Sequence, residues 1–177
     1  KALDVSLGMT PVEGLMMGTR SGDVDPGVLT FLMEAEGLQA AGISELINKK
    51  SGVLGVSGVS SDMREIEDAI KNGNERATLA MTMYDYRIKK YVGAYAAAMG
   101  GVDVLVFTGG VGENQYTTRE KVCTDMEFMG IVFDSKVNEG MRGKEMVISK
   151  PESKVTVIVV PTDEEYMIAS DTMTILK

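Results

Sequence analysis

One glycine-rich segment of this sequence combines residue types that could bind an anion. Gly109-Gly110-Val111-Gly112-Glu113-Asn114 directly follows the apolar run Val102 to Thr108, and ligands of open α/β sheets bind just past the carboxyl ends of strands. Glycines there let backbone amides approach an anion, and a following helix adds a favourable dipole. Gln115 stands where a dinucleotide fingerprint has its third glycine, and no Gly-Lys-Ser/Thr follows. A tight turn that binds no nucleotide therefore stays open as the alternative.

Arg20 is a second candidate, because it lies in a polar loop between Gly18 and Gly22 and close to Asp23 and Asp25. A guanidinium in such a loop can neutralise an anionic substrate or the charge on a transferring phosphoryl group. An ordinary solvated loop charge is the alternative interpretation.

Asp62 and Arg64 allow two interpretations as well. Asp62 can cap a helix from Met63 to Ile70 while Arg64 is solvated, or the two side chains can face a nucleotide at that helix N-terminus.

Glu164 follows Thr162 where a strand ends and a helix starts. Mg²⁺ needs few protein carboxylates because water and phosphate complete its shell, so one glutamate suffices there. A first-turn glutamate that only stabilises the helix dipole is equally simple. The series Thr162-Asp163-Glu164-Glu165 also predicts a capping box between Thr162 and Glu165.

The composition excludes several activities. The 177 residues contain 18 Lys and Arg, 26 Asp and Glu and no His, for a net charge of −8. Because the chain has no His, it cannot by itself supply an imidazole base, a His metal ligand or a Ser-His pair. A single Cys123 forms no internal disulfide or Cys-rich zinc site. The acidic balance argues against general nucleic-acid binding.

No apolar run approaches a membrane span, since the longest, Val155 to Pro161, has the length of a strand. No secretory signal opens the chain, so we expect a cytoplasmic protein without a membrane partner. The first residue is Lys1, and residues 1 to 8 resemble the end of an element already under way, so the chain can be a fragment.

Strands alternating with helices predict an α/β fold in one domain. Residues 51 to 61 are expected to form a Gly/Ser-rich loop packed against the body. The run Val102 to Thr108 is typical of a strand buried on both faces of a parallel sheet. Strands are predicted at 3–7, 102–108, 130–133 and 155–160. Helices are predicted at 26–36, 43–48, 63–70 and 74–99, and two further helices begin near residue 117 and after residue 162.

The helix predicted from Asn74 to Met99 would be about 39 Å long at 1.5 Å per residue. Its large side chains fall on one stripe, which indicates the core or, as an alternative, a subunit interface. The stripe comprises Ala77, Met81, Tyr84, Ile88, Tyr91, Tyr95 and Met99.

Taken in order, these segments resemble the acetate kinase family. Ser6 to Pro26 is similar to the family's long signature, and the glycine-rich segment Phe107 to Asn114 is similar to its ATP loop. Three further blocks match in family order: Lys50 to Gly58, Ser61 to Arg64 and Pro161 to Glu165. The resemblance covers the whole chain.

The resemblance implies an actin-like, ribonuclease-H-like ATPase fold, as in sugar kinases and Hsp70-type ATPases. Family members are about twice this length, so residues 1–177 correspond to the C-terminal nucleotide-binding and dimerisation lobe, with the N-terminal lobe absent. The implied reaction is reversible transfer of the ATP γ-phosphoryl group to acetate, giving acetyl phosphate and ADP, with Mg²⁺ or, alternatively, Mn²⁺. A homodimer through this lobe is also implied.

Residue by residue, the resemblance makes Arg20 the arginine that stabilises the transferring phosphoryl group. It places Asp62, Met63 and Arg64 near the adenosine and Glu164 at Mg²⁺. It assigns the ATP loop to Gly110, Val111, Gly112, Glu113 and Asn114.

The family's second arginine, catalytic aspartate, histidine and Mg²⁺-associated asparagine belong to the half that this sequence lacks, so we expect the chain alone to be inactive. A propionate or butyrate kinase of the same family stays open, as does a non-catalytic nucleotide-binding or dimerisation module. A dinucleotide-dependent oxidoreductase fits poorly without the third glycine.

Overall fold

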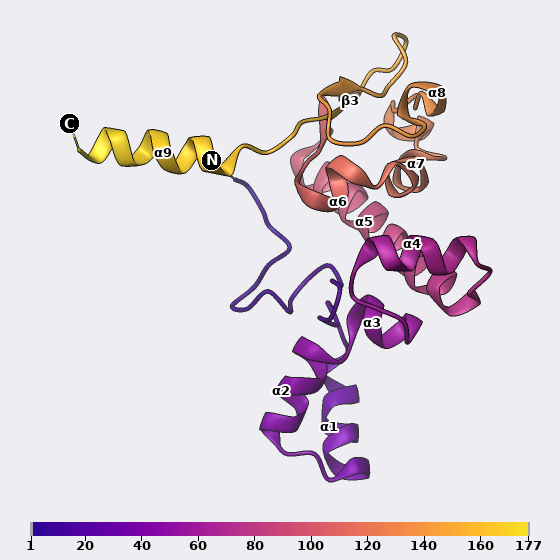
Figure 1. Cartoon of the computed structure of the whole chain (residues 1–177), viewed down its shortest axis with the longest axis vertical. Coiled ribbons are helices and arrows are strands. Elements are labelled where there is room, and N and C mark those ends of the chain that lie inside the picture. The colour runs from indigo at the N-terminus through magenta and orange to yellow at the C-terminus, as the bar shows by residue number, and fades with distance from the viewer. Residues whose placement is uncertain (1, 177) are drawn as a thin grey trace. The chain divides into compact units, whose positions relative to one another are not determined.

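The computed structural model describes residues 2–176 and divides into two compact units, Lys1–Gly100 and Gly101–Lys177. The first unit is helical (Figure 1). Its helices are α1 (Pro26–Glu36), α2 (Ala40–Lys49), α3 (Gly52–Ser57), α4 (Met63–Lys71) and α5 (Glu75–Met99).

The second unit holds a small mixed sheet in strand order β1-β3-β2 with helices around it. Its elements are β1 (Val104–Phe107), α6 (Gly109–Asn114), α7 (Tyr116–Cys123), the 3-10 turn η1 (Glu127–Met129), α8 (Ser135–Asn138), β2 (Met146–Val147), β3 (Thr156–Val159) and α9 (Glu164–Ile175).

Two helices begin at the capping residues that the sequence predicts. The Asp25 side chain accepts a hydrogen bond from the Gly27 amide, and Gly37 ends α1 in the left-handed conformation at φ 64°. Asn74 caps α5 by accepting from the Ala77 amide. These two predicted helices are confirmed.

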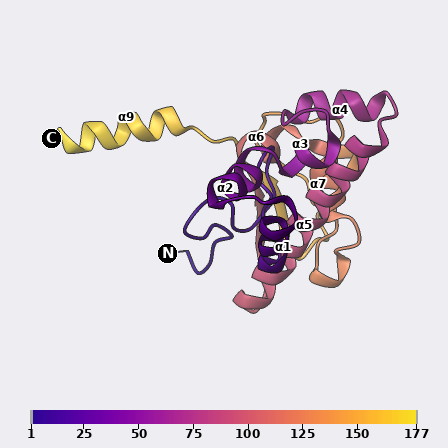
Figure 2. The same ribbon diagram turned by 90° about the horizontal axis from the view of Figure 1, so that it is seen from below.

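The apolar stripe of α5 is buried only over its first half. Ala77, Met81 and Tyr84 are buried, whereas Met99 is 54% exposed. α3 and α4 both pack against α5, as Figure 2 shows from below. The core interpretation is therefore confirmed for the N-terminal half of the stripe.

The expected loop at residues 51–61 is wrong in part, because its first half forms α3. Gly52 starts the helix at φ +64°, and a Cβ built on it would lie 2.2 Å from the Met17 carbonyl oxygen. Only glycine allows so close an approach, and Gly58 ends the helix in the left-handed conformation. The segment does pack against the body, since Val53 is fully buried.

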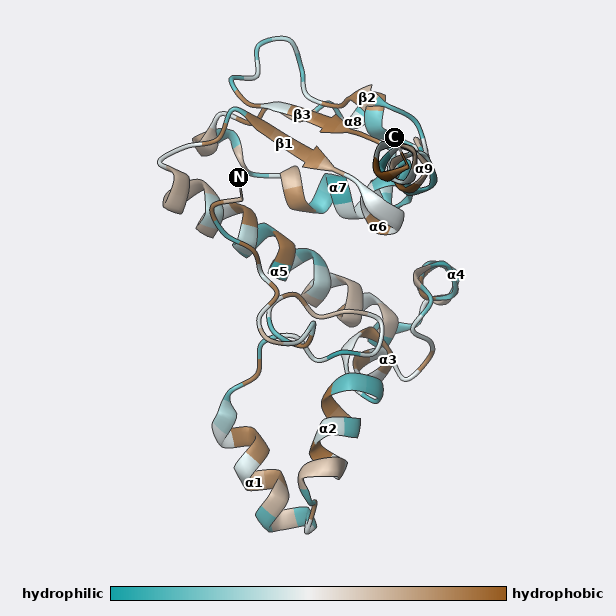
Figure 3. Ribbon diagram, turned by 90° about the vertical axis from the view of Figure 1, so that its left-hand side faces the viewer, coloured by the Kyte–Doolittle hydropathy of each residue, from teal (hydrophilic) through white to brown (hydrophobic). Residues whose placement is uncertain are grey.

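The expectation that the run Val102 to Thr108 lies in a parallel sheet is confirmed, because β1 pairs in parallel with β3, with Val104 opposite Thr156 and Phe107 opposite Val159. β2 adds an antiparallel edge that the sequence did not indicate, pairing Met146 with Val159. Both β1 and β3 are strongly hydrophobic in Figure 3.

Burial on both faces of β1 is wrong for the described chain. Val104 and Val106 are about half exposed, whereas Phe107 at the carboxyl end is buried. The alternate residues of a strand point to opposite faces, and here one face is covered.

Two other predicted strands do not form. Residues 3–7 lie in irregular backbone, because alternation alone makes no strand without a partner and no described residue pairs with them. In the segment 130–133, Gly130 takes the left-handed conformation after η1, and only Phe133 forms a bridge, to Ser149.

The terminal helix α9 buries none of its described residues. Among the residues that the structure describes, no helix combines the length and the apolar character needed to cross a membrane.

Candidate functional site

The glycine-rich segment is a short helix, α6, placed at the carboxyl end of β1. Gly109 enters it at φ +70°, and a Cβ on Gly112 would lie 3.1 Å from the Phe107 carbonyl carbon, so this glycine lets the helix pack on the strand end. A Cβ on Gly109 or Gly110 would meet nothing within 4 Å. The first turn therefore has an open face with room for a ligand.

The Glu113 side chain joins α6 to the segment that follows β3. Its Oε1 accepts hydrogen bonds from the Thr162 amide at 2.9 Å and the Thr162 hydroxyl at 3.0 Å. These donors, with the Thr162 amide first, hold the pKa of the Glu113 carboxyl below its usual range. Glu113 thus links the two loops that leave the parallel strands.

Glu164 lies in the first turn of α9, but the predicted capping box is wrong. The cap is Asp163, whose side chain accepts from the Tyr166 amide at 3.0 Å. The Thr162 hydroxyl donates to Glu113 instead, 49 residues away in sequence.

Within the described residues, no group of three His, Cys, Asp or Glu side chains could hold a metal. Glu164 is exposed in the first turn of α9, and a Mg²⁺ ion whose shell is completed by phosphate and water needs only one such carboxylate.

Arg119 is the residue that sequence reasoning missed. Its side chain is fully buried in α7. The guanidinium donates to the Gly112 carbonyl at 2.8 Å, to Asn138 Oδ1 at 2.8 Å and to the Met141 carbonyl at 2.6 Å. Asn138 in turn donates to the Tyr116 carbonyl at 2.8 Å. Burial lowers the pKa of Arg119 from its usual value.

A second arginine supports the end of the same segment. Arg142 donates to the Asn114 carbonyl at 2.7 Å, and its guanidinium lies 5.5 Å from the centre of the Tyr116 ring. The Asn114 side-chain amide donates back to the Gly110 carbonyl at 3.0 Å. Carbonyl oxygens of α6 are thus tied to the protein body. The Gly109 amide is bound by the Glu113 carboxylate, so the first-turn amides that remain for a ligand are those of Gly110 and Val111.

Arg20 lies in the first unit, on a loop whose backbone is held closely by α3. The Val53 amide donates to the Met17 carbonyl at 2.9 Å, and the Leu54 amide donates to the Gly18 carbonyl at 2.8 Å. The Met17 amide closes a tight turn onto the Arg20 carbonyl at 3.0 Å. The loop is therefore ordered by main-chain contacts.

The four arginines of the first unit differ in their partners. Arg64 pairs with Asp62 at 2.6 Å, Arg87 pairs with Asp23 at 3.3 Å, and Arg76 donates to the Val56 carbonyl at 2.6 Å. Arg20 donates to the Met17 sulfur at 3.5 Å, and a thioether is a weak acceptor. Among the residues described in this unit, Arg20 is thus the arginine whose side-chain hydrogen bond goes to sulfur and not to oxygen.

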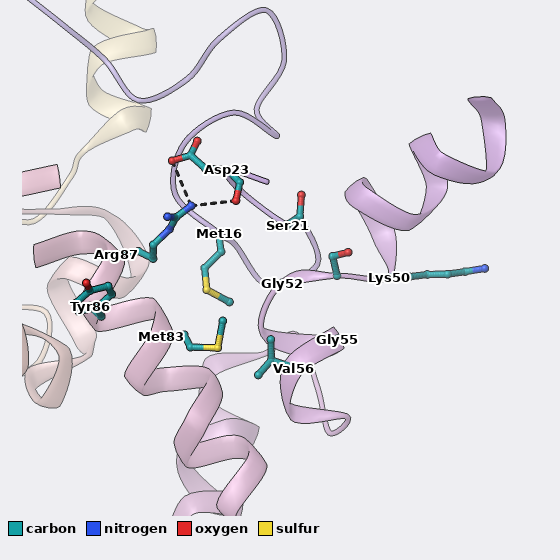
Figure 4. Close-up of a pocket in the computed structure, with 11 residues that line it drawn as sticks. Met16, Ser21, Asp23, Lys50, Gly52, Gly55, Val56, Met83, Tyr86 and Arg87 are labelled. Carbon is teal, nitrogen blue, oxygen red and sulfur yellow. Dashed lines mark hydrogen bonds and ion pairs between the residues drawn. The ribbon is translucent and has the colours of Figure 1, made fainter. Parts of the chain in front are cut away.

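Asp23 closes the loop that carries Arg20. It accepts from the Gly14 amide at 2.8 Å and from the Tyr91 hydroxyl at 2.6 Å. The Tyr91 hydrogen bond lowers the pKa of Asp23, while burial and this contact raise the pKa of Tyr91 to about 12. Figure 4 shows Asp23 and Arg87 beside a cavity of about 640 Å³.

Asp62 caps α4, accepting from the Arg64 amide at 2.9 Å, and the Arg64 guanidinium holds the pKa of Asp62 at about 2. The predicted cap is confirmed, with Arg64 paired to the same carboxylate, and the alternative that the two side chains face a nucleotide stays a prediction. Met63, the first residue of α4, is half-buried. A Cβ on Gly18 would lie 2.7 Å from the Ser61 carbonyl oxygen, so the Arg20 loop lies against this segment.

The structure thus gathers the candidate residues into two groups. Glu113, the rest of α6 and Thr162, which precedes Glu164, lie at the carboxyl edge of the sheet in the second unit. Arg20 and the segment 62–64 belong to the first unit, where Gly18 of the Arg20 loop lies against Ser61. The fold and the site define a mixed α/β protein with a glycine-rich segment suited to an anionic ligand.

Comparison with known proteins gives the particular family. Residues 1–170 match the model of the acetokinase family, and the chain belongs to that family. It is 99% identical over all 177 residues to an acetate kinase of Porphyromonas gingivalis, and 68% identical over 177 residues to the acetate kinase of Bacteroides thetaiotaomicron.

Solved structures agree. The crystal structure of Porphyromonas gingivalis acetate kinase matches all of this chain at 99% identity with a TM-score of 0.97. A propionate kinase from Francisella tularensis matches 93% of this chain at 36% identity with a TM-score of 0.84. The mixed α/β fold is therefore that of acetate kinase.

The chain spans 44% of the length of the Porphyromonas and Bacteroides relatives, and 41% of the propionate kinase chain. Activity, substrates and partners are properties of those longer polypeptides.

Proposed function

We propose that this chain is the C-terminal, nucleotide-binding lobe of an acetate kinase. The enzyme transfers the γ-phosphoryl group of Mg²⁺-ATP to acetate and gives acetyl phosphate and ADP, reversibly. The observation that carries the proposal is the 99% identity over the whole chain to an acetate kinase. The actin-like assignment, cytoplasmic location and homodimer formation belong to the same proposal and rest on the family resemblance.

In this reaction an acetate oxygen forms a bond to the γ-phosphorus while the bond from that phosphorus to the β,γ-bridging oxygen breaks. The transition state is loose and its charge spreads over the phosphoryl oxygens, so catalysis depends on positioning and positive charge. No strong base is required for a carboxylate nucleophile.

The residues divide this work between two tasks. Arg20 supplies charge to the transferring phosphoryl group, consistent with a guanidinium whose described hydrogen bond goes only to a thioether. The segment Gly110 to Asn114 binds the ATP phosphates through the open backbone amides of its first turn, and Glu164 would contribute an oxygen to Mg²⁺. Mn²⁺ suits the same carboxylate.

Asp62, Met63 and Arg64 contribute to the nucleoside end of the ATP site. Asp62 already accepts the Arg64 amide and guanidinium. In this arrangement Asp62 orients Arg64, and the exposed guanidinium face is the part available to the nucleotide.

A propionate kinase is the second candidate, because such an enzyme shares this fold at a TM-score of 0.84. The two differ in the pocket that receives the acyl group. Comparing kcat/KM for acetate, propionate and butyrate with the full-length polypeptide separates them. Preference for acetate supports the proposal, and preference for a longer acid supports the alternative.

A non-catalytic nucleotide-binding or dimerisation module is the third candidate. The full-length polypeptide should form acetyl hydroxamate from ATP, acetate and hydroxylamine, because acetyl phosphate acylates hydroxylamine. Absence of the product, with ATP binding retained in calorimetry, would favour the module.

A further inference from the structure

Asp23 sits where the loop carrying Arg20 meets α5, and nothing in the proposed chemistry uses it directly. The Tyr91 hydroxyl and the Arg87 guanidinium both approach Asp23 Oδ2, at 2.6 Å and 3.3 Å. Arg87 also donates to the Asp23 carbonyl at 3.1 Å. Two residues one turn apart on α5 therefore hold a single loop residue.

The same carboxylate closes the loop on itself. The Gly14 amide donates to Asp23 Oδ1 at 2.8 Å, and the Asp23 amide donates to the Gly14 carbonyl at 2.9 Å. Gly22 packs so tightly that a Cβ would lie 2.5 Å from the Met16 amide nitrogen. Residues 14–23 thus form a closed loop whose ends meet at Asp23.

The other side of this loop rests on α3. A Cβ on Gly52 would lie 2.2 Å from the Met17 carbonyl oxygen and 2.7 Å from the Arg20 carbonyl oxygen. Arg20 is therefore held between two supports, the start of α3 and the contact of Asp23 with α5. The α3 support is made of main-chain contacts, whereas the α5 support is made by the Asp23 carboxylate, with one further hydrogen bond from Arg87 to the Asp23 carbonyl.

Arg87 and Arg20, the two arginines near this loop, differ in the partners of their charges. Arg87 is neutralised by Asp23, and its side chain is 27% exposed. Lys90 also faces Asp23 from α5 and favours its ionised form. The Arg87 charge is thus engaged in holding the loop, whereas the Arg20 guanidinium has the Met17 thioether as its hydrogen-bond partner.

We infer that Asp23, held by Tyr91 and Arg87, is a positioning residue that fixes Arg20 for phosphoryl transfer. The inference rests on the proposed function, because Arg20 needs a precise position only if it contacts the transferring group. Displacing a catalytic group by about 1 Å can reduce the rate about a hundredfold.

The test uses a full-length acetate kinase that carries this segment. Asp23→Ala removes all side-chain contacts of the carboxylate and should lower kcat about tenfold to a hundredfold. KM for ATP should stay within about twofold, because the nucleotide is bound by other residues. Asp25→Asn is the matched control, since that carboxylate, two residues on, caps α1. Its kcat should equal that of the wild type.

The decisive comparison repeats Asp23→Ala in an Arg20→Ala background. A residue that acts through Arg20 has nothing left to position, so the residual rate should change less than about twofold. If the two losses multiply instead, or if Asp23→Ala alone leaves kcat unchanged, the inference is wrong.

Tyr91→Phe covers the case in which Asp23→Ala does not fold. It keeps the ring and removes only the hydroxyl that binds Asp23, so the protein should fold with a melting temperature only a few degrees lower, while kcat falls about two- to tenfold. Tyr86→Phe, on the exposed face of the same helix, is its control. A Tyr91→Phe kcat equal to that of Tyr86→Phe would overturn the inference.

Failure of the proposed function gives a different pattern. In that case the wild-type polypeptide forms no acetyl phosphate, or Arg20→Ala retains full activity. Failure of the positioning role alone leaves Arg20→Ala inactive and Asp23→Ala active.

Discussion

Replacing Arg119 by Met tests how the glycine-rich segment is held. Methionine has a similar length and keeps the apolar contacts, but it cannot donate to Gly112, Asn138 and Met141. The three acceptors are bound at 2.6 to 2.8 Å by one fully buried guanidinium. The substitution therefore removes a single set of charge-assisted hydrogen bonds.

The magnitude follows from two opposing effects. Each hydrogen bond to a charged donor contributes about 1.5 to 3 kcal/mol, so three contribute roughly 4.5 to 9 kcal/mol before desolvation. Burying a guanidinium costs several kcal/mol, which the variant recovers. We expect Arg119→Met to lower the free energy of unfolding by about 2 to 4 kcal/mol, because the acceptors stay buried without a donor.

Urea unfolding followed by far-ultraviolet circular dichroism measures the loss. Hydrogen exchange by mass spectrometry locates it, with faster exchange expected in peptides covering 109–115 and 138–143. Lys121→Met is the control, since this exposed lysine lies two residues further along α7. A loss below about 0.5 kcal/mol, or unchanged exchange in 109–115, would refute the reasoning.

Three further outcomes are expected. Gly52→Ala should reduce kcat of the full-length enzyme at least tenfold, because its Cβ would lie 2.2 Å from the Met17 oxygen and displace Arg20. Gly58→Ala, equally strained at φ +67° but unobstructed, should not reduce it. Folding lowers the pKa of Asp23, so the ionised carboxylate stabilises the protein above its unfolded pKa near 3.8, and this stabilisation is lost in more acidic solution. The free energy of unfolding of Asp23→Asn, measured in urea, should therefore depend less on pH below 4 than that of the wild type. The purified 177-residue chain, which spans 44% of the related acetate kinase, should form no acetyl hydroxamate, because the family resemblance assigns the second arginine and the catalytic aspartate to residues outside it; measurable product would contradict this.

Periodicity explains which elements the sequence predicts well. The α5 helix has an apolar stripe and an Asn74 cap, and its observed bounds agree with the expectation. β3 is a short, continuous β-branched run. Both signals are local. The pairing of β3 with β2 is not local, and the edge strand of two residues has no pattern of its own.

Tertiary contacts explain the failures. The series Thr162 to Glu165 satisfies a capping-box pattern, yet the Thr162 hydroxyl bonds Glu113 while Asp163 caps the helix. The sequence alone does not show whether the Thr162 hydroxyl bonds a carboxylate that is distant in sequence or a nearby backbone amide. α3 was expected as a loop, because its glycines lower helix propensity. Its close packing on the Met17 segment outweighs that penalty.

The sequence predicts which residues form the candidate site, but it does not predict which other residues hold them in place. The types and order of the residues predict α6, Arg20 and Glu164 as candidate site residues, because the same segments occur in the same order in the acetate kinase family. Arg119 gave no signal, since an arginine in a polar helix is usually solvated. Its burial depends on Asn138 and Met141, which are distant in sequence.

The most direct test measures acetyl phosphate formation by a full-length polypeptide carrying this segment, with and without Arg20→Ala. We expect ATP- and Mg²⁺-dependent transfer to acetate in the wild type and a loss of kcat of about a thousandfold or more in the variant, with KM for ATP nearly unchanged. An Arg20→Ala enzyme within tenfold of wild-type kcat would contradict the role of this arginine in phosphoryl transfer.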